Sequence, residues 1–116
     1  MRHQRRKMMN VAPAHRKALL RNLSISLIEH GKIKSTVAKC KAVKPYVEKL
    51  ITIAREDSVA ARRLAYSKLN NREAVLKLFA DVGPKHKERA GGYTRIHRLA
   101  DTRVGDSAPM GIISIL

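Results

Sequence analysis

The stretch VGPKHKERAGGYTRI, residues 82–96, decides the fold, because helical periodicity ends within it and strand-like alternation begins. Gly83 and Pro84 predict the end of a helix, since glycine accepts a left-handed backbone and proline cannot continue a helix. The pair Gly91-Gly92 allows close backbone approach to another molecule, and a strand is expected from Tyr93. The stretch therefore separates a helical part of the chain from a C-terminal strand part.

Two helices are expected in the first half of the chain, each with an apolar stripe at helical spacing. The first starts at Pro13, which suits a first helical position, and ends at Gly31. Thr36 can cap the second helix, and Pro45 inside it removes a backbone hydrogen bond and predicts a kink. Residues 32–35, between the two helices, are expected to form a short strand with its lysines on the outer face.

Two more helices are expected before the glycine pair. Asp57 or Ser58 can cap a third, short helix that runs through Lys68. Asn70, with Glu73 three residues later, resembles a capping box for a fourth helix. The helical part of the chain should therefore contain four helices.

The C-terminal part reads as a hairpin of strands 93–100 and 110–116, joined by the turn-rich segment 101–109. The fold class predicted is α+β: a single two-layer domain in the order αβαααββ, with four helices packed on a small three-stranded sheet. Residues 13–116 would form this globular domain. Residues 1–12 lack any periodicity and would form an extended basic RNA-binding arm.

Charge is the strongest guide to function: 25 Lys and Arg residues face 9 Asp and Glu residues, which gives a formal net charge of +16. The first acidic residue is Glu29, so one end of the chain is a positive pole. Charge of this density repels itself unless a polyanion neutralises it. Nucleic acid is the partner expected, because binding to it gains affinity from counterion release.

Several function classes lack the residues they need. The five histidines and Cys40 form no recognised metal-ligand or catalytic spacing, so no metal, cofactor or catalytic residue is predicted. Cys40 lies between two lysines, which can lower a thiol pKa, but a small buried side chain is the favoured interpretation. The glycine pair does not match a phosphate-binding loop, so no small-molecule substrate is expected. No apolar run is long enough to span a membrane.

The scarcity of aromatic residues narrows the kind of nucleic acid. Tyr46, Tyr66, Phe79 and Tyr93 are the complete set, and they offer no stacking platform for unpaired bases. Folded RNA gripped by its backbone and shape is therefore the expected ligand, with Tyr93 alone available for stacking. A duplex-DNA-binding architectural protein stays an alternative at this point.

Several motifs, in this order along essentially the whole chain, resemble the bacterial-type ribosomal large-subunit protein 17 family. They include Met1-Arg2-His3, the segment HRKALLRNL at 15–23 and IKST at 33–36. The most specific are GGYTRI at 91–96 and GDSAPM at 105–110. The resemblance implies a structural protein of the large ribosomal subunit that binds large-subunit rRNA near the polypeptide exit tunnel.

The same resemblance implies large-subunit rRNA and neighbouring large-subunit ribosomal proteins as partners. It places the protein in a cytoplasmic ribosome, with an organellar ribosome left open. The RNA contacts expected from the charge and the resemblance together lie in the arm, at the start of the first helix, on the first strand and around the glycine pair. They are Arg2, His3, Arg5, Arg6, Lys7, His15, Arg16, Lys17, Arg21, Lys32, Lys34, Arg89, Gly91, Gly92, Tyr93, Arg95, Arg98 and Arg103.

Overall fold

Nine elements follow one another in the computed structural model, which describes residues 13–116, apart from the side chain of Asp101. The predicted arm, with Arg2, His3, Arg5, Arg6 and Lys7, lies outside the described residues. The elements are α1 (Pro13–His30), β1 (Lys32–Thr36), α2 (Val37–Ala54), α3 (Val59–Leu69), α4 (Arg72–Lys77), the π-helical η2 (Leu78–Val82), α5 (Gly83–Lys85), β2 (Thr94–Thr102) and β3 (Pro109–Ile115). Because α4, η2 and α5 follow without a break, the α+β class and the order αβαααββ are confirmed.

The sheet is antiparallel and has the order β1-β3-β2, so the last strand in the sequence lies in the middle. Ile113 on β3 pairs with Ile33 on β1 and with Ile96 on β2. Directly paired residues share one face of a sheet, so these three side chains point together into the core. Ile113 is fully buried there.

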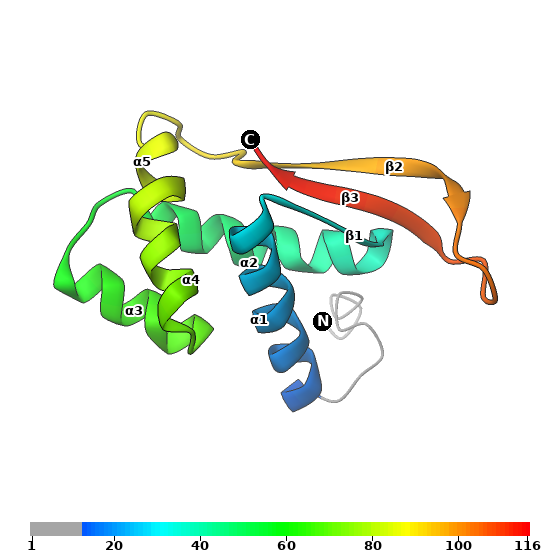
Figure 1. Ribbon diagram of the computed structural model, residues 1–116, viewed down its shortest axis with the longest axis horizontal. Helices are drawn as coiled ribbons and strands as arrows, with labels where there is room; N and C mark the ends of the chain where they lie inside the picture. The colour runs from blue at the N-terminus through cyan, green and yellow to red at the C-terminus, as the bar shows by residue number, and fades with distance from the viewer. Residues whose placement is uncertain (1–12) are drawn as a thin grey trace, which may run out of the picture.

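Helix α2 is the central element of the core. Val43, Val47, Leu50 and Ile51 on this helix have no exposed surface. The sheet extends along one side of α2, whereas α3 and α4 lie towards the other end of the molecule (Figure 1). Helix α2 runs without interruption through Pro45, so the predicted kink does not divide it.

Two of the predicted helix caps are confirmed. The Thr36 hydroxyl accepts a hydrogen bond from the backbone N–H of Lys39 at 3.2 Å, and the Ser58 hydroxyl accepts one from Ala61 at 3.0 Å. Each bond satisfies an N–H group that has no partner within its own helix. Gly31 has φ +82° and ends α1 as predicted, because glycine alone adopts this conformation without strain.

The predicted cap of the fourth helix is wrong by one residue. Asn71, not Asn70, accepts a hydrogen bond from Ala74 N at 2.9 Å and caps α4. Asn70 has φ 51° and terminates α3 in the left-handed conformation that asparagine tolerates. Two adjacent asparagines thus divide the two tasks, and sequence alone does not show which one takes which.

The predicted helix end at Gly83 and Pro84 is also wrong. Gly83 has φ −59°, an ordinary helical value, and the helix continues to Lys85 through the wide π turn η2. A Cβ at position 83 would lie 2.2 Å from the carbonyl oxygen of Ala54. The glycine is therefore needed for close helix packing rather than for a helix stop.

Candidate nucleic-acid interface

The outward face of the sheet gathers basic residues that are far apart in the sequence. Lys32 on β1 and Arg95 on β2 both pair with Ser114 of the central strand. Lys34 and His97 both pair with Ile112 in the same way. Paired residues share a face, so two cross-strand rows carry four basic side chains on the face opposite the core.

These rows form a compact basic surface, named here the sheet face: Lys32, Lys34, Arg95 and His97. All four residues are exposed. With strands about 4.8 Å apart and about 3.4 Å rise per residue, their backbone positions span roughly 10 by 7 Å. Neither row contains an acidic residue. The sheet face therefore suits a polyanion and offers no internal neutralisation.

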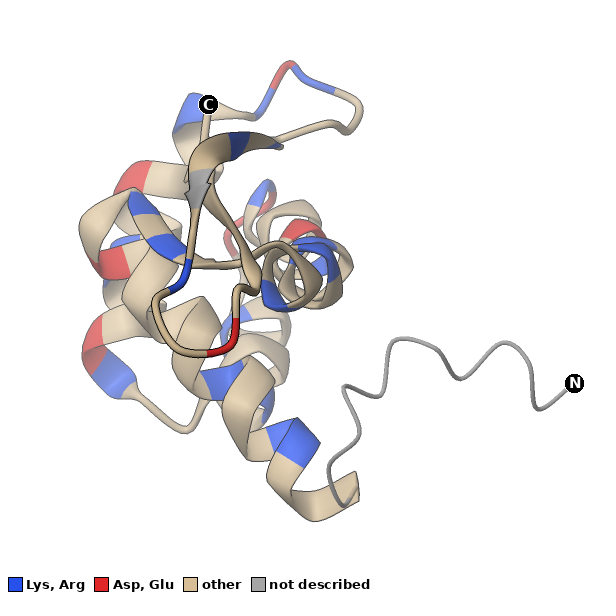
Figure 2. Ribbon diagram, turned by 90° about the vertical axis from the view of Figure 1, so that its right-hand side faces the viewer, with Lys and Arg blue, Asp and Glu red and all other residues tan. Residues whose placement is uncertain are grey.

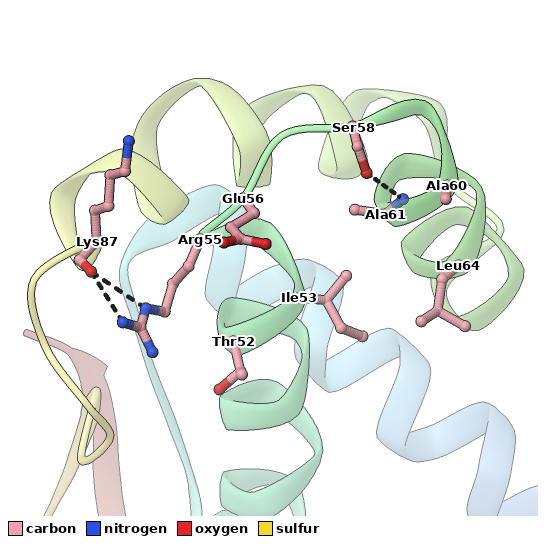
Figure 3. Close-up of a pocket in the computed structure, with 9 residues that line it drawn as sticks. All are labelled: Thr52, Ile53, Arg55, Glu56, Ser58, Ala60, Ala61, Leu64 and Lys87. Carbon is pink, nitrogen blue, oxygen red and sulfur yellow. Dashed lines mark hydrogen bonds between the residues drawn. The ribbon is translucent and has the colours of Figure 1, made fainter.

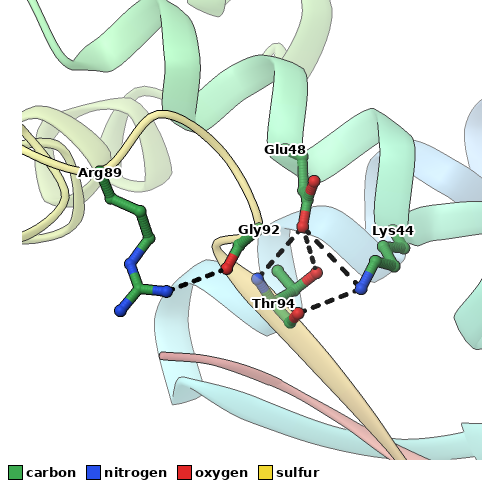
Figure 4. Close-up of polar contacts among 5 residues, drawn as sticks. All are labelled: Lys44, Glu48, Arg89, Gly92 and Thr94. Carbon is green, nitrogen blue, oxygen red and sulfur yellow. Dashed lines mark hydrogen bonds and ion pairs between the residues drawn. The ribbon is translucent and has the colours of Figure 1, made fainter.

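A polar clamp fixes the start of β2 on α2 (Figure 4). One carboxylate oxygen of Glu48 accepts hydrogen bonds from Thr94 N at 3.2 Å and from the Thr94 hydroxyl at 2.8 Å. The Lys44 ammonium donates to the Thr94 carbonyl at 3.1 Å. Because Arg95 follows directly, the clamp holds the neighbouring cation of the sheet face in place.

The loop before this clamp keeps its backbone open. Gly91 has φ +144° and Gly92 φ +64°, and a Cβ added at either position would meet nothing within 4 Å. Glycine is therefore needed at these two positions for the backbone conformation and not for close packing. Arg89 contacts the loop through a long hydrogen bond of 3.5 Å to the carbonyl of Gly92. Backbone N–H groups and an exposed guanidinium thus lie beside the sheet face.

The expectation that Tyr93 stacks on RNA is wrong, because its side chain is only 1% exposed. The ring lies edge to face with His86, with centroids 5.4 Å apart. The Tyr93 hydroxyl accepts hydrogen bonds from Thr52 at 3.3 Å and from Arg55 at 3.4 Å. Tyr93 anchors the loop to the core instead, a role for which the sequence carries no signal.

The predicted contacts at the start of α1 form a second, separate group. His15 and Lys17 are exposed there, and Arg16 is half-buried, with its Nε shielded and unpartnered among residues 13–116. At 1.5 Å per residue, the far end of α1 next to the sheet is about 22 Å from His15. Arg21 donates to the Lys68 carbonyl at 3.3 Å, so it also ties α1 to the end of α3.

Two other predicted contacts are not part of the sheet face. Arg98 pairs with Gly111, and because side chains alternate along a strand, it projects to the opposite face from Arg95. Arg103 is bound by Asp106 in the hairpin turn, with Nε 3.1 Å from Oδ1. This hydrogen bonding lowers the pKa of Asp106 to about 2. Arg103 is therefore already paired with an anion.

Sequence reasoning missed His97, which occupies the sheet face beside Lys34. Its position two residues after Arg95 was the available signal, since residues i and i+2 of a strand share a face. Positive charge is not confined to this surface: Figure 2 shows Lys and Arg residues on the sheet and along the helices. On the sheet face, basic residues from β1 and β2 converge in strand rows that contain no acidic residue.

A cleft of about 590 Å³ lies at the junction of α2 and α3 (Figure 3). Its polar groups have structural tasks: Ser58 caps α3, and Arg55 donates two hydrogen bonds to the Lys87 carbonyl, at 3.0 and 3.3 Å. Glu56 is the one acid in the lining, which includes no histidine or cysteine. The hydroxyls of Ser58 and Thr52 are hydrogen-bonded to the backbone or to another hydroxyl and not to a basic group, so the cleft holds no activated nucleophile.

Cys40 is buried, with its Sγ 3.8 Å from the Gly111 carbonyl oxygen. Burial raises the pKa of this thiol, which opposes reactivity, so the favoured interpretation of a buried side chain is confirmed. Within residues 13–116, no group of three His, Cys, Asp or Glu residues could hold a metal ion. No helix in the same residues is long and apolar enough to cross a membrane.

Comparison with known proteins covers most of the chain. The family described as Ribosomal protein L17 matches residues 19–116. The chain belongs to this family. It is also 55% identical over 102 residues to the large ribosomal subunit protein bL17 of Persephonella marina. The aligned residues cover 87% of this chain and 82% of that protein. The predicted family is confirmed, and the chain is a structural ribosomal protein of the large subunit rather than an enzyme.

Proposed function

We propose that this L17 family member binds large-subunit rRNA through the sheet face and the neighbouring Gly91-Gly92 loop. The basic arm and the start of α1 would provide a second contact. The observation that carries the proposal is the register, which places Lys32 and Lys34 of β1 beside Arg95 of β2 across a strand with no acidic residue. Cations that converge in this way can contact neighbouring phosphates of one RNA segment.

The chemistry of the surface favours folded RNA read by its backbone. Lysine and arginine on a rigid sheet supply phosphate contacts, and the glycine loop supplies open backbone N–H groups. With the Tyr93 ring buried, the sheet face has no exposed Phe, Tyr or Trp ring, and the imidazole of His97 is its one ring for stacking on an unpaired base. Selectivity would therefore come from shape and 2′-hydroxyl contacts rather than from base edges.

The salt dependence of RNA binding tests the proposal. A triple variant, Lys32→Gln, Lys34→Gln and Arg95→Gln, should bind large-subunit rRNA with a log–log salt slope that is shallower by roughly 2 to 3, at about 0.7 to 0.9 per lost phosphate contact. The matched control removes three exposed helical charges, through Lys41→Gln, Lys49→Gln and Lys85→Gln. Both variants have the same net charge, so only the position of the charges differs.

An equal loss of slope in both triple variants would contradict the proposal, because overall charge would then explain the binding. A competition experiment addresses the alternative of a DNA-binding protein. Generic duplex DNA, added at equal phosphate concentration in moderate salt, should fail to displace the rRNA. Displacement would show that the surface recognises charge without regard to RNA shape.

We further propose that the sheet face lies on rRNA near the polypeptide exit tunnel of a cytoplasmic ribosome. The family membership and the motif resemblance support this location. Because Cys40 is buried, a Lys34→Cys variant offers one accessible thiol among residues 13–116. A hydroxyl-radical-generating iron chelate attached to it in assembled large subunits should cut rRNA around the tunnel exit. Cuts confined to another part of the subunit would refute the location.

A further inference from the structure

The surface of α3 and α4 exposes apolar side chains that a lone domain would be expected to bury. Val59 is 67% exposed, Leu64 48%, Tyr66 49% and Leu76 49%. Among residues 13–116, the one other large apolar residue with such exposure is Val104 in the hairpin turn. Three of these residues, Val59, Tyr66 and Leu76, line one groove on α3 and α4, whereas Leu64 lines the cleft between α2 and α3. Exposed apolar side chains that gather in one place in this way mark an interaction site.

Part of this surface is hollowed into a groove of about 330 Å³, named here the α3–α4 groove. Val59, Tyr66 and Leu76 form its apolar lining together with Val75, which is 6% exposed and belongs to the core. The remaining lining residues are all arginines: Arg62, Arg63 and Arg72. The groove thus combines an apolar floor with a cationic rim and has no acidic lining residue.

The rim is partly preorganised. Both carboxylate oxygens of Asp57 accept hydrogen bonds from Arg62, at 2.7 and 2.8 Å, and the Arg62 guanidinium lies 5.2 Å from the centre of the Phe79 ring. Arg63 and Arg72 are exposed and form no ion pair within the described part of the chain. Two guanidinium groups therefore remain available to carboxylates of a partner.

We propose that the α3–α4 groove binds an apolar segment of a neighbouring ribosomal protein, flanked by acidic residues. Apolar side chains of the partner would be buried against Tyr66 and Leu76, which gains free energy in proportion to the area covered. Carboxylates beside that segment would meet Arg63 and Arg72. A single partner segment would then contact both the apolar lining and the arginine rim of the groove.

Two other occupants fit less well. A second copy of this chain would bring arginine rims together on molecules that each carry a formal charge of +16, and such like-charge contacts are unfavourable. RNA could bind the arginines through its phosphates and stack a base on Tyr66, but it would leave the aliphatic side chains of Val59 and Leu76 uncovered. The groove also lies on helices at the far end of the molecule from β2 and β3 (Figure 1).

The proposal rests on family membership and not on the sheet face as an RNA site, so the two can fail separately. The test places a diazirine-bearing leucine analogue at position 76 of the full chain and, as a matched control, at Ile112 on the outer side of the sheet. Assembled large subunits are purified and irradiated, and the cross-linked products are identified by mass spectrometry after nuclease and protease digestion.

Position 76 should cross-link to a ribosomal protein, at a peptide with apolar residues and flanking Asp or Glu. Cross-links from position 76 to rRNA, to a second copy of this chain, or to nothing would each overturn the proposal. Position 112 reports on the sheet face independently, since cross-links to rRNA are expected there whatever happens at position 76.

A second measurement tests the charged rim. Arg63→Glu combined with Arg72→Glu should lower the yield of the protein cross-link from position 76 at least about tenfold, because reversed charges oppose the carboxylates. The control pair Arg63→Lys and Arg72→Lys should keep most of the yield. Circular dichroism verifies that both variants fold, and an unchanged yield in the folded Glu variant would overturn the proposal.

Discussion

The sheet face and the α3–α4 groove are both exposed surfaces, but the chain builds them in different ways. The sheet face joins residues of β1 and β2 that are more than sixty positions apart, and it exists only because both strands pair with β3. The groove comes from one continuous segment, 59–76, through the spacing of two consecutive helices. One surface therefore depends on long-range register, and the other on local helix geometry and its support by the core.

The two surfaces also differ in the interaction that a partner would supply. Cations on the sheet face repel one another until an anion arrives, an effect that added salt weakens. Apolar side chains of the groove stay in contact with water until another apolar surface covers them, an effect that salt screening does not touch. Stability measurements on variants can separate the two, and the following predictions run from the largest expected effect to the smallest.

Gly83→Ala should disrupt the packing of the helical run from α4 to α5, which carries part of the groove, against α2. Its Cβ would lie 2.2 Å from the Ala54 carbonyl oxygen, so the helical run from α4 to α5 must shift away from α2. We expect a loss of roughly 3 kcal/mol in the free energy of unfolding, measured by urea titration, because backbone cannot yield as a side chain can. The control, Gly31→Ala, meets no atom within 4 Å and suffers only its positive φ, at a cost of about 1 to 2 kcal/mol. Equal losses would contradict a packing role for Gly83.

Thr94→Val should weaken the sheet side alone. The substitution removes the hydroxyl that donates to Glu48 at 2.8 Å, and it keeps the shape of the side chain. A loss of about 1 to 2 kcal/mol is expected for a hydrogen bond to a charged group that is partly buried. Hydrogen exchange should accelerate at the amides of residues 94 to 96 and stay unchanged in α3. Equally faster hydrogen exchange in both regions would contradict a local stabilising role for the clamp.

Single substitutions on the two exposed surfaces should change stability with a different dependence on salt concentration. Lys34→Gln and Leu76→Ser should each change stability by less than about 0.5 kcal/mol, because neither residue is buried. At low salt Lys34→Gln should be stabilising, since it removes repulsion within the sheet face, and the effect should disappear in high salt. The change caused by Leu76→Ser should be independent of salt. A salt-dependent effect at position 76 would mean that charge also dominates the groove.

Acid should produce the smallest effect, confined to the hairpin turn beyond the sheet face. Arg103 lowers the pKa of Asp106 from its ordinary value of 3.8 to about 2. A carboxyl with a lowered pKa stabilises the fold above its ordinary pKa, and this contribution is lost as the pH falls through about 2. NMR titration should follow the loss at Asp106 and Arg103, and Asp106→Asn should abolish it. A transition near pH 4 would show that the pair does not form in solution.

Local chemistry explains which features could be predicted from the sequence. Caps at Thr36 and Ser58, and the left-handed end at Gly31, depend on neighbouring residues and were predicted correctly. The predicted helix end at Gly83 is wrong because the function of this glycine depends on Ala54, which is distant in the sequence. The predicted RNA contact of Tyr93 is wrong because nothing in its sequence neighbours reveals the His86 ring that packs against it.

The candidate site shows the same limit. Composition and the motifs indicated Lys32, Lys34 and Arg95, but not that they converge. Convergence requires the register of β1 and β2 against β3, which no local pattern specifies. The separation of Arg98 from Arg95 is different, because it follows from the alternation of side chains along β2 and could have been predicted from their spacing of three.

The central place of β3 has a consequence for the order of events during synthesis. Within residues 13–116, β1 and β2 each pair with β3 and with no other strand, so this sheet cannot assemble until residues 109–115 have left the ribosome that makes them. At about 5 to 20 residues per second, β1 waits roughly 4 to 15 s after its own translation for a partner. Helices α1 to α4 can collapse during that interval. The sheet therefore closes last, and the proposed RNA surface becomes complete only when the final strand has joined the core.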